Sequence, residues 1–147
     1  MASAVRVEVV EKVDADLVEA VGSLLPQLSS TSPAPGSEDL AVVVGSPATS
    51  LLVARDPAGA IVGMLTLVVL RLPTGVKAAI EDVVVDGSHR GKGAGAALVG
   101  AALEAALASG ARSVDLTSRP SRIEANRLYQ KLGFELRETN VYRYSSR

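Results

Sequence analysis

Glycines and basic residues alternate in residues 90–95, which read Arg-Gly-Lys-Gly-Ala-Gly. The segment follows the apolar stretch 80–85 and precedes a stretch rich in alanine and leucine, so a strand should end here and a helix begin. The first turn of a helix presents backbone N–H groups without intrahelical partners. Glycine lets that backbone approach a ligand closely, and Arg90 and Lys92 add positive charge. The segment is therefore a candidate phosphate-binding turn.

The spacing of the glycines restricts the kind of phosphate. A Walker-type loop has four residues between its first glycine and the Gly-Lys pair, followed by Ser or Thr. Here three residues separate Gly87 from Gly91, and Gly93 stands where the hydroxyl should be. A dinucleotide fingerprint can be assembled from Gly91, Gly93 and Ala96 with Asp115 as the ribose acid, but too little chain follows for a doubly wound sheet. The spacing disfavours both nucleotide motifs.

Two adjacent acids, Glu81 and Asp82, interrupt the apolar stretch before the glycines. An acid in such a stretch is costly unless it is paired or functional, so at least one is a candidate base. Neighbouring residues of a regular strand face opposite sides of a sheet, which predicts that only one faces a substrate. We favour Glu81. The alternative is that one acid pairs with a basic neighbour and the other lies at the rim of the sheet.

Composition excludes several classes of protein. The 147 residues include fifteen basic and sixteen acidic side chains, a balance that favours neither nucleic acid nor a membrane surface as partner. No stretch resembles a signal peptide or a membrane span, so we expect a cytoplasmic protein. Cysteine is absent and His89 is the single histidine, which leaves no thiolate chemistry and makes a Ser-His-Asp triad improbable. The length predicts one domain, residues 1–147.

The N-terminal half alternates between strand-like and helical patterns. We expect a strand at 4–11, a helix capped by Asp14 that ends near 28, and a surface loop at 29–36. Residues 37–40 start a weak helix, which 41–45 either continue or leave as a short strand; we favour the helix. Residues 49–55 and 60–72 then form an antiparallel hairpin across a Pro-Gly turn, followed by a strand at 76–85.

The C-terminal half begins with the helix that follows the glycines. It should span 94–109 and end at Gly110, before a strand at 114–117 that lies parallel to 76–85. A capping box formed by Ser121 and Glu124 predicts a last helix, which Gly133 ends, and residues 134–144 supply one or two final strands. The order βααβββαβαβ predicts an α/β protein (an α+β mixed sheet) with helices covering the sheet.

Two motifs carry a family resemblance. Residues 90–95 match the Arg/Gln-x-x-Gly-x-Gly/Ala pattern of the GNAT superfamily of N-acetyltransferases, and residues 126–134 resemble its Asn-x-x-Tyr-x-x-x-Gly-Phe segment. The resemblance is close over roughly residues 50–144 and rests on element order before that. It implies the GNAT acyl-CoA N-acyltransferase fold, acetyl-CoA as cosubstrate without a metal, an amine acceptor and a possible homodimer.

The resemblance also implies roles for particular residues. The backbone of Val83 to Val85 would bind pantetheine amides, with the Val84 N–H polarising the thioester carbonyl. Tyr129 would protonate the departing thiolate, unless it is an ordinary tyrosine at the edge of the core. The residues implied in cofactor binding are Val83, Val84, Val85, Arg90, Gly91, Lys92, Gly93, Ala94, Gly95, Asn126 and Tyr129, and those implied in catalysis are Tyr129, Glu81 and Asp82.

The leading hypothesis is direct acetyl transfer to a primary amine, since no cysteine is present to carry the acyl group. The alternative is a non-catalytic acyl-CoA-binding regulatory module of the same fold. The acceptor stays open, although four basic residues are candidates for recognising a carboxylate or phosphate on it: Arg71, Lys77, Arg119 and Arg122. We expect His89 to be a solvated turn residue rather than a base.

Overall fold

The computed structural model describes residues 5–146, which fall into two compact units divided between Thr117 and Ser118. Each unit is described by itself below. The start of the predicted first strand, residue 4, lies outside the described residues. Among the residues that are described, no helix combines the length and apolar character needed to cross a lipid bilayer.

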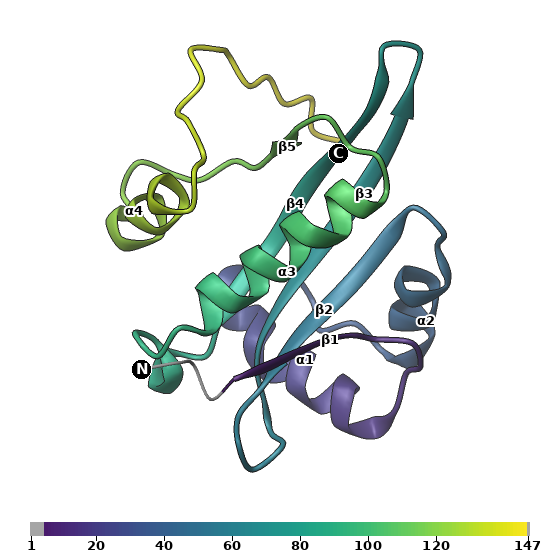
Figure 1. The fold of residues 1–147 in the computed structure, drawn as a ribbon. Coiled ribbons are helices and arrows are strands. Elements are labelled where there is room, and N and C mark those ends of the chain that lie inside the picture. The colour runs from purple at the N-terminus through teal and green to yellow at the C-terminus, as the bar shows by residue number, and fades with distance from the viewer. Residues whose placement is uncertain (1–4, 147) are drawn as a thin grey trace. The chain divides into compact units, whose positions relative to one another are not determined.

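The first unit is a five-stranded sheet with helices on both faces (Figure 1). The strands lie in the order β1-β2-β3-β4-β5, antiparallel except for the parallel pair β4 and β5. Its elements are β1 (Arg6–Val9), α1 (Ala15–Leu28), α2 (Ser37–Gly45), β2 (Thr49–Arg55), β3 (Ile61–Leu72), β4 (Gly75–Val85), the 3-10 turn η1 (Gly87–His89), α3 (Ala94–Ala108) and β5 (Val114–Asp115). The mixed α/β class, the hairpin and the helical reading of 41–45 are confirmed.

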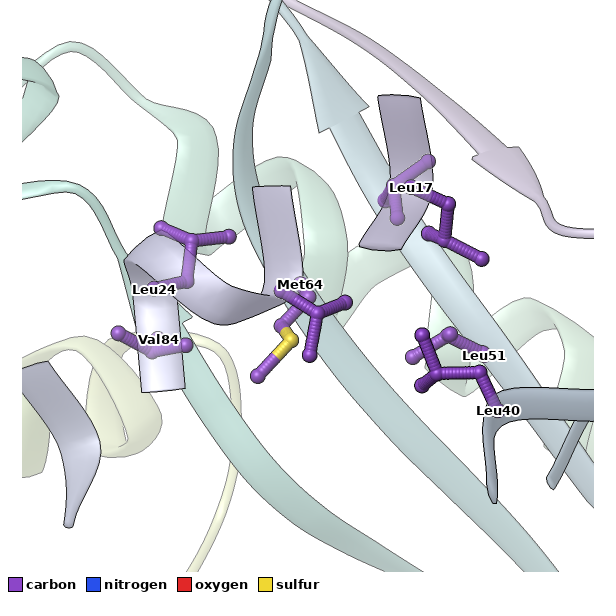
Figure 2. Close-up of a cluster of buried hydrophobic side chains, with 8 residues drawn as sticks. Leu17, Leu24, Leu40, Leu51, Met64 and Val84 are labelled. Carbon is purple, nitrogen blue, oxygen red and sulfur yellow. The ribbon is translucent and has the colours of Figure 1, made fainter. Parts of the chain in front are cut away.

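One face of the sheet is covered by α1 and α2. Asp14 caps α1 as predicted, its Oδ1 accepting from the Leu17 N–H at 2.8 Å. The helical spacing then places Leu17, Val21 and Leu24 on one stripe. These three residues belong to one core cluster with Met64 and Val84 of the sheet, and Figure 2 labels Leu17, Leu24, Met64 and Val84 in it. The cluster fixes α1 against the end of β4 from which the glycine-rich turn departs.

The opposite face is covered by α3, which runs along the sheet in Figure 1. Its buried side chains are small or branched: Ala94, Leu98, Val99, Ala102 and Ala106. Gly63 of β3 lets the helix approach, since a Cβ there would lie 3.1 Å from Leu98 Cδ1 and 3.2 Å from the Val84 carbonyl oxygen. Close packing of α3 therefore sets where its N-terminus points.

A β-bulge in β4 overturns the simple alternation expected for the two acids. Glu81 pairs with Thr66 and Val84 pairs with Met64, so two residues of β4 lie opposite Leu65. Asp82 occupies the bulge with a φ of 52°, the one non-glycine with positive φ among the described residues. Because the bulge re-aims the strand, both acids are exposed, and alternation no longer decides between them.

The sheet ends in a short parallel ladder. β4 and β5 pair only through Ala78 with Val114 and Ala79 with Asp115, so β5 is shorter than the predicted strand at 114–117. Beyond Ala79, the described part of β5 offers β4 no further partner on that edge. The last residues of β4 thus have one edge against β3 and the other outside the ladder.

The second unit contains α4 (Ile123–Lys131) and the segment that follows it. The predicted capping box is wrong: Arg122 is the N-cap without a side-chain cap bond, and Ser121 lies in the preceding turn. The Arg119 carbonyl organises this helix start, since it accepts from the N–H of Arg122 and from Asn126 Nδ2, both at 3.0 Å. The predicted final strands are also wrong, because described residues 134–146 form no strand.

Candidate active site

The glycine-rich turn has the geometry of an anion-binding helix start. Gly91 and Gly93 have φ values of 77° and 87°, which favour glycine, and Gly93 is the N-cap of α3 without a side-chain cap bond. The first intrahelical bond runs from the Ala97 N–H to the Gly93 carbonyl at 3.0 Å. The N–H groups of Ala94 and Gly95 therefore have no intrahelical partner. The first turn of α3 carries no acidic side chain that would repel an anion.

Basic side chains flank this helix start. Arg90 and Lys92 are exposed on either side of Gly91. Arg90 folds back toward the sheet and donates from Nε to the Val85 carbonyl oxygen at 3.4 Å. The contact brings a guanidinium from the turn to the end of β4, so the helix start and the strand end lie next to each other.

The register of β4 shows which backbone groups face that edge. The Asp86 N–H donates to the Val62 carbonyl at 2.8 Å, which makes the pair of Val84 and Met64 the next hydrogen-bonded pair. The N–H of Val84 therefore points toward β3, and the groups of Val85 point away from it. This parity disfavours Val84 as the donor to the thioester carbonyl, a role that stays a prediction, because the groups expected to point outward belong to its neighbours, Val83 and Val85.

Glu81 lies on the α1 and α2 side of the sheet. It pairs with Thr66, and Thr66 pairs in turn with Leu51, a member of the core cluster on that face. Cross-strand partners share a face, so the exposed Glu81 carboxylate opens on the same side as α1 and α2. Asp82 follows in the bulge, with its backbone rotated away from this alternation.

The basic acceptor candidates separate by face. Lys77 pairs with Leu70 and shares the face of Glu81, whereas Arg71 pairs with Val76 on the α3 face. There Arg71 lines a cavity of about 410 Å³ with Pro47, Ala48, Val69 and Ser109. The other two candidates, Arg119 and Arg122, lie in the second unit. Of the two candidates in the first unit, Lys77 is the one that shares a sheet face with the candidate base.

A polar cluster at the exit of β4 escaped the sequence analysis. Asp86 accepts hydrogen bonds from Ser88, from Gln27 Nε2 at 2.8 Å and from His89 Nδ1 at 3.2 Å. These bonds hold the pKa of Asp86 well below its usual range. His89 Nε2 also lies 3.8 Å from Asp56 Oδ2, so this half-exposed turn residue has carboxylate neighbours that the sequence did not indicate. Gln27 is 59 residues from Asp86 in the sequence, so no local sequence motif could indicate this contact.

The second unit holds the remaining candidates on one helix. Tyr129 is 7% exposed, and its ring meets Phe134 edge to face with centroids 5.9 Å apart. Burial raises the pKa of Tyr129, an effect that Arg122 partly opposes, so its phenol stays protonated at neutral pH. Asn126 lies one turn earlier, and its Nδ2 is used within the unit by the Arg119 carbonyl. Its amide therefore has a local structural role in addition to any contact with a cofactor.

A sequence profile identifies the family. Residues 23–134 match the acetyltransferase (GNAT) family, a span that includes the glycine-rich turn, both acids and Tyr129. The chain belongs to this family of acetyltransferases. Comparison with curated proteins gives no match.

Solved structures agree with this assignment. An acetyltransferase from Trypanosoma brucei is 28% identical with a TM-score of 0.77, over 96% of this chain and 99% of that chain. An aminoglycoside acetyltransferase from an uncultured soil metagenomic sample is 22% identical with a TM-score of 0.84, over 97% and 96%. Glucosamine-6-phosphate N-acetyltransferase from Arabidopsis thaliana is 20% identical with a TM-score of 0.80, over 97% and 99%. The last two likenesses concern the fold alone.

Proposed function

We propose that this chain is an acetyl-CoA-dependent N-acetyltransferase that moves an acetyl group directly to a primary amine. The observation that carries the proposal is the uncapped start of α3, with Gly91 and Gly93 before it and the outer edge of β4 beside it. A long ligand with an anionic diphosphate at one end and amide groups at the other fits this combination.

The first unit offers each part of that ligand a different surface. The N–H groups of Ala94 and Gly95, with Arg90 and Lys92, suit the diphosphate, because helix starts and guanidinium groups both favour anions. The outward N–H and C=O groups of Val83 and Val85 suit the pantetheine amides. Acetyl-CoA, when bound, supplies an acetyl group activated as a thioester.

Glu81 is the proposed base. An amine that is protonated at neutral pH must lose that proton before its nitrogen can attack a carbonyl carbon, and a carboxylate accepts the proton directly or through a water molecule. The exposed side chain of Glu81 opens on the α1 and α2 face, which it shares with Thr66 and Lys77. We place the amine acceptor on this face. Asp82 is the second candidate, one residue on in the bulge.

Tyr129 is the proposed acid. Its raised pKa keeps the phenol protonated, the form needed to donate a proton to a departing thiolate. A bond forms between the amine nitrogen and the carbonyl carbon, the carbon–sulfur bond breaks, and the sulfur leaves with the bonding electrons. Tyr129 gives its proton to the sulfur. Glu81 takes the proton that the ammonium loses before attack and passes it to water, and the second proton leaves the nitrogen by the same route as the amide forms. Exchange with water then restores Tyr129. The products are an N-acetyl amine and the free CoA thiol.

Thiol release with a panel of amines tests the proposal. Calorimetry first measures the Kd for acetyl-CoA, and a thiol reagent then follows CoA release. The panel includes aminoglycosides and an amino-sugar phosphate, because fold neighbours are named for acetylating such compounds, together with amino acids, polyamines and peptides. We expect binding well below millimolar concentration and thiol release with at least one amine. Tight binding without release across the panel would favour the regulatory module, and no binding would reject both.

A further inference from the structure

The turn that leads into the phosphate-binding segment is tied to a distant helix by a two-way amide contact. Gln27, in the last turn of α1, donates from Nε2 to Asp86 Oδ1 at 2.8 Å. Its Oε1 accepts from the Gly87 N–H, also at 2.8 Å. One side-chain amide thereby bonds both an acceptor, Asp86 Oδ1, and a donor, the Gly87 N–H. These two bonds hold the residues that follow β4 against α1.

The second oxygen of Asp86 organises the rest of the turn. Oδ2 accepts from the backbone and hydroxyl of Ser88 and lies 3.2 Å from His89 Nδ1. His89 Nε2 in turn faces Asp56 Oδ2 at 3.8 Å, in the turn between β2 and β3. The segment before Arg90 is thus held from two sides, by α1 and by the hairpin.

We propose that Gln27 and Asp86 are positioning residues for the diphosphate of acetyl-CoA. The segment between η1 and α3 is flexible by composition, because Gly91 and Gly93 restrict the backbone little. Its shape must come from its two ends, which are the packed helix α3 and the anchor at Asp86. A turn held in its binding shape before the ligand arrives loses less conformational entropy on binding. The inference rests on the proposed use of acetyl-CoA, and it states that part of the affinity for CoA comes from a turn that is already held in its binding shape.

A swap of hydrogen-bond polarity tests the contact. Gln27→Glu keeps an acceptor for the Gly87 N–H but turns a carboxylate oxygen toward Asp86. Asp86→Asn keeps a carbonyl oxygen that accepts from Ser88 and His89. Its NH₂ group then faces the NH₂ group of Gln27, so two donors meet and the bond is lost. In the double variant, the new Asn donates to the new Glu and the contact is restored. Glu19→Gln, an exposed change on the same helix, is the control.

We expect each single variant to weaken CoA binding about three- to tenfold in calorimetry, the net contribution of one ordinary hydrogen bond. The double variant should return to within about twofold of the parent chain. At saturating acetyl-CoA, kcat should be unchanged in all of them, with the effect confined to KM for acetyl-CoA. S-acetylpantetheine, which has the thioester without the diphosphate, should be turned over equally by all variants.

Three results would overturn the inference. They are unchanged CoA affinity in folded single variants, a double variant as weak as the singles, and equal losses with acetyl-CoA and S-acetylpantetheine. Circular dichroism confirms that each variant is folded. Failure of the proposed function looks different, because the parent chain itself would then neither bind CoA nor release thiol.

Discussion

Tyr129 combines a buried ring with a polar group that can act on a ligand. Its ring is held by the edge contact to Phe134, and the Phe134 N–H donates to the Tyr129 carbonyl at 3.0 Å. These contacts involve the ring and the backbone, so they survive removal of the hydroxyl. The hydroxyl can therefore be tested without disturbing the helix that carries it.

Tyr129→Phe should lower kcat about a hundredfold, the usual contribution of a positioned acid, and leave the Kd for acetyl-CoA unchanged. Steady-state thiol release and calorimetry measure the two quantities. Burial raises the pKa of Tyr129 above its ordinary value of 10.0, so any alkaline loss of kcat from this group should begin at a higher pH than an exposed phenol would give. A variant that retains full kcat would make Tyr129 an ordinary core residue.

Glu81→Gln and Asp82→Asn form a matched pair at adjacent exposed positions. Glu81→Gln should lower kcat/KM for the amine about a hundredfold at pH 7, because the carboxylate no longer accepts the proton. The loss should narrow toward pH 10, where an alkyl amine deprotonates unaided. Asp82→Asn should stay within about threefold. The reverse ranking in pH–rate profiles would assign the base to Asp82.

Individual residues were predictable where their role follows from type and spacing. The glycines and Arg90 occupy the places that the motif indicates, since a helix start needs little beyond backbone and charge. The backbone donor was not predictable, because the direction of the Val84 N–H depends on hydrogen-bond parity with β3. Gln27 was missed, and the carboxylate neighbours of His89 were not predicted, because these contacts are set by packing of α1 and the hairpin against the turn.

At the scale of elements, α3 presents a left-handed glycine near each end. Gly91 precedes the helix with a φ of 77° and Gly110 follows it with a φ of 86°. A Cβ at either position would meet nothing within 4 Å. Alanine at either site should therefore cost about 1 kcal/mol through backbone strain alone. The two sites are matched in backbone conformation and open space, and Gly91 is the one that lies in the proposed diphosphate site.

Gly91→Ala should weaken CoA binding about tenfold or more, because the strained turn no longer holds its N–H groups in place. Gly110→Ala should lose similar stability and keep the affinity of the parent chain. Thermal unfolding and calorimetry on both variants provide the comparison. Equal affinity in the two variants would show that the conformation of Gly91 does not matter for the ligand.

Helices and strands were predictable wherever the residues of a single segment determine its structure through local patterns such as caps, turns and periodicity. The capped helix α1 and the hairpin of β2 and β3 are local patterns, and their bounds agree closely with the sequence. The bulge at Asp82 was not predictable, since it exists only relative to β3. The predicted strands at 134–144 failed because strand formation needs a partner that buries side chains. Leu136 and Tyr144 there are 91% and 99% exposed.

At the scale of the whole molecule, the Asp86 anchor links pH to stability. Hydrogen bonds from Ser88, Gln27 and His89 lower the pKa of Asp86 in the folded chain below its ordinary value of 3.8. The unfolded chain therefore takes up this proton at a higher pH than the folded chain does. The stabilisation is complete above that ordinary value and is lost as the pH falls through the folded value.

Asp86→Asn should accordingly lower Tm by about 3 °C at pH 7, and the gap to the parent chain should narrow steadily as the pH falls below about 4, with part of it remaining at pH 2. Melting curves at pH 7, 5, 4, 3 and 2 measure the gap, with Glu19→Gln as the control for the loss of a surface charge. A gap that persists unchanged at pH 2 would mean that the anchor does not depend on the ionised carboxylate. A narrowing gap would show that protonation of Asp86 lowers the stability of the folded chain. Because we propose that the same residue positions the diphosphate, the affinity for CoA should decline over the same pH interval.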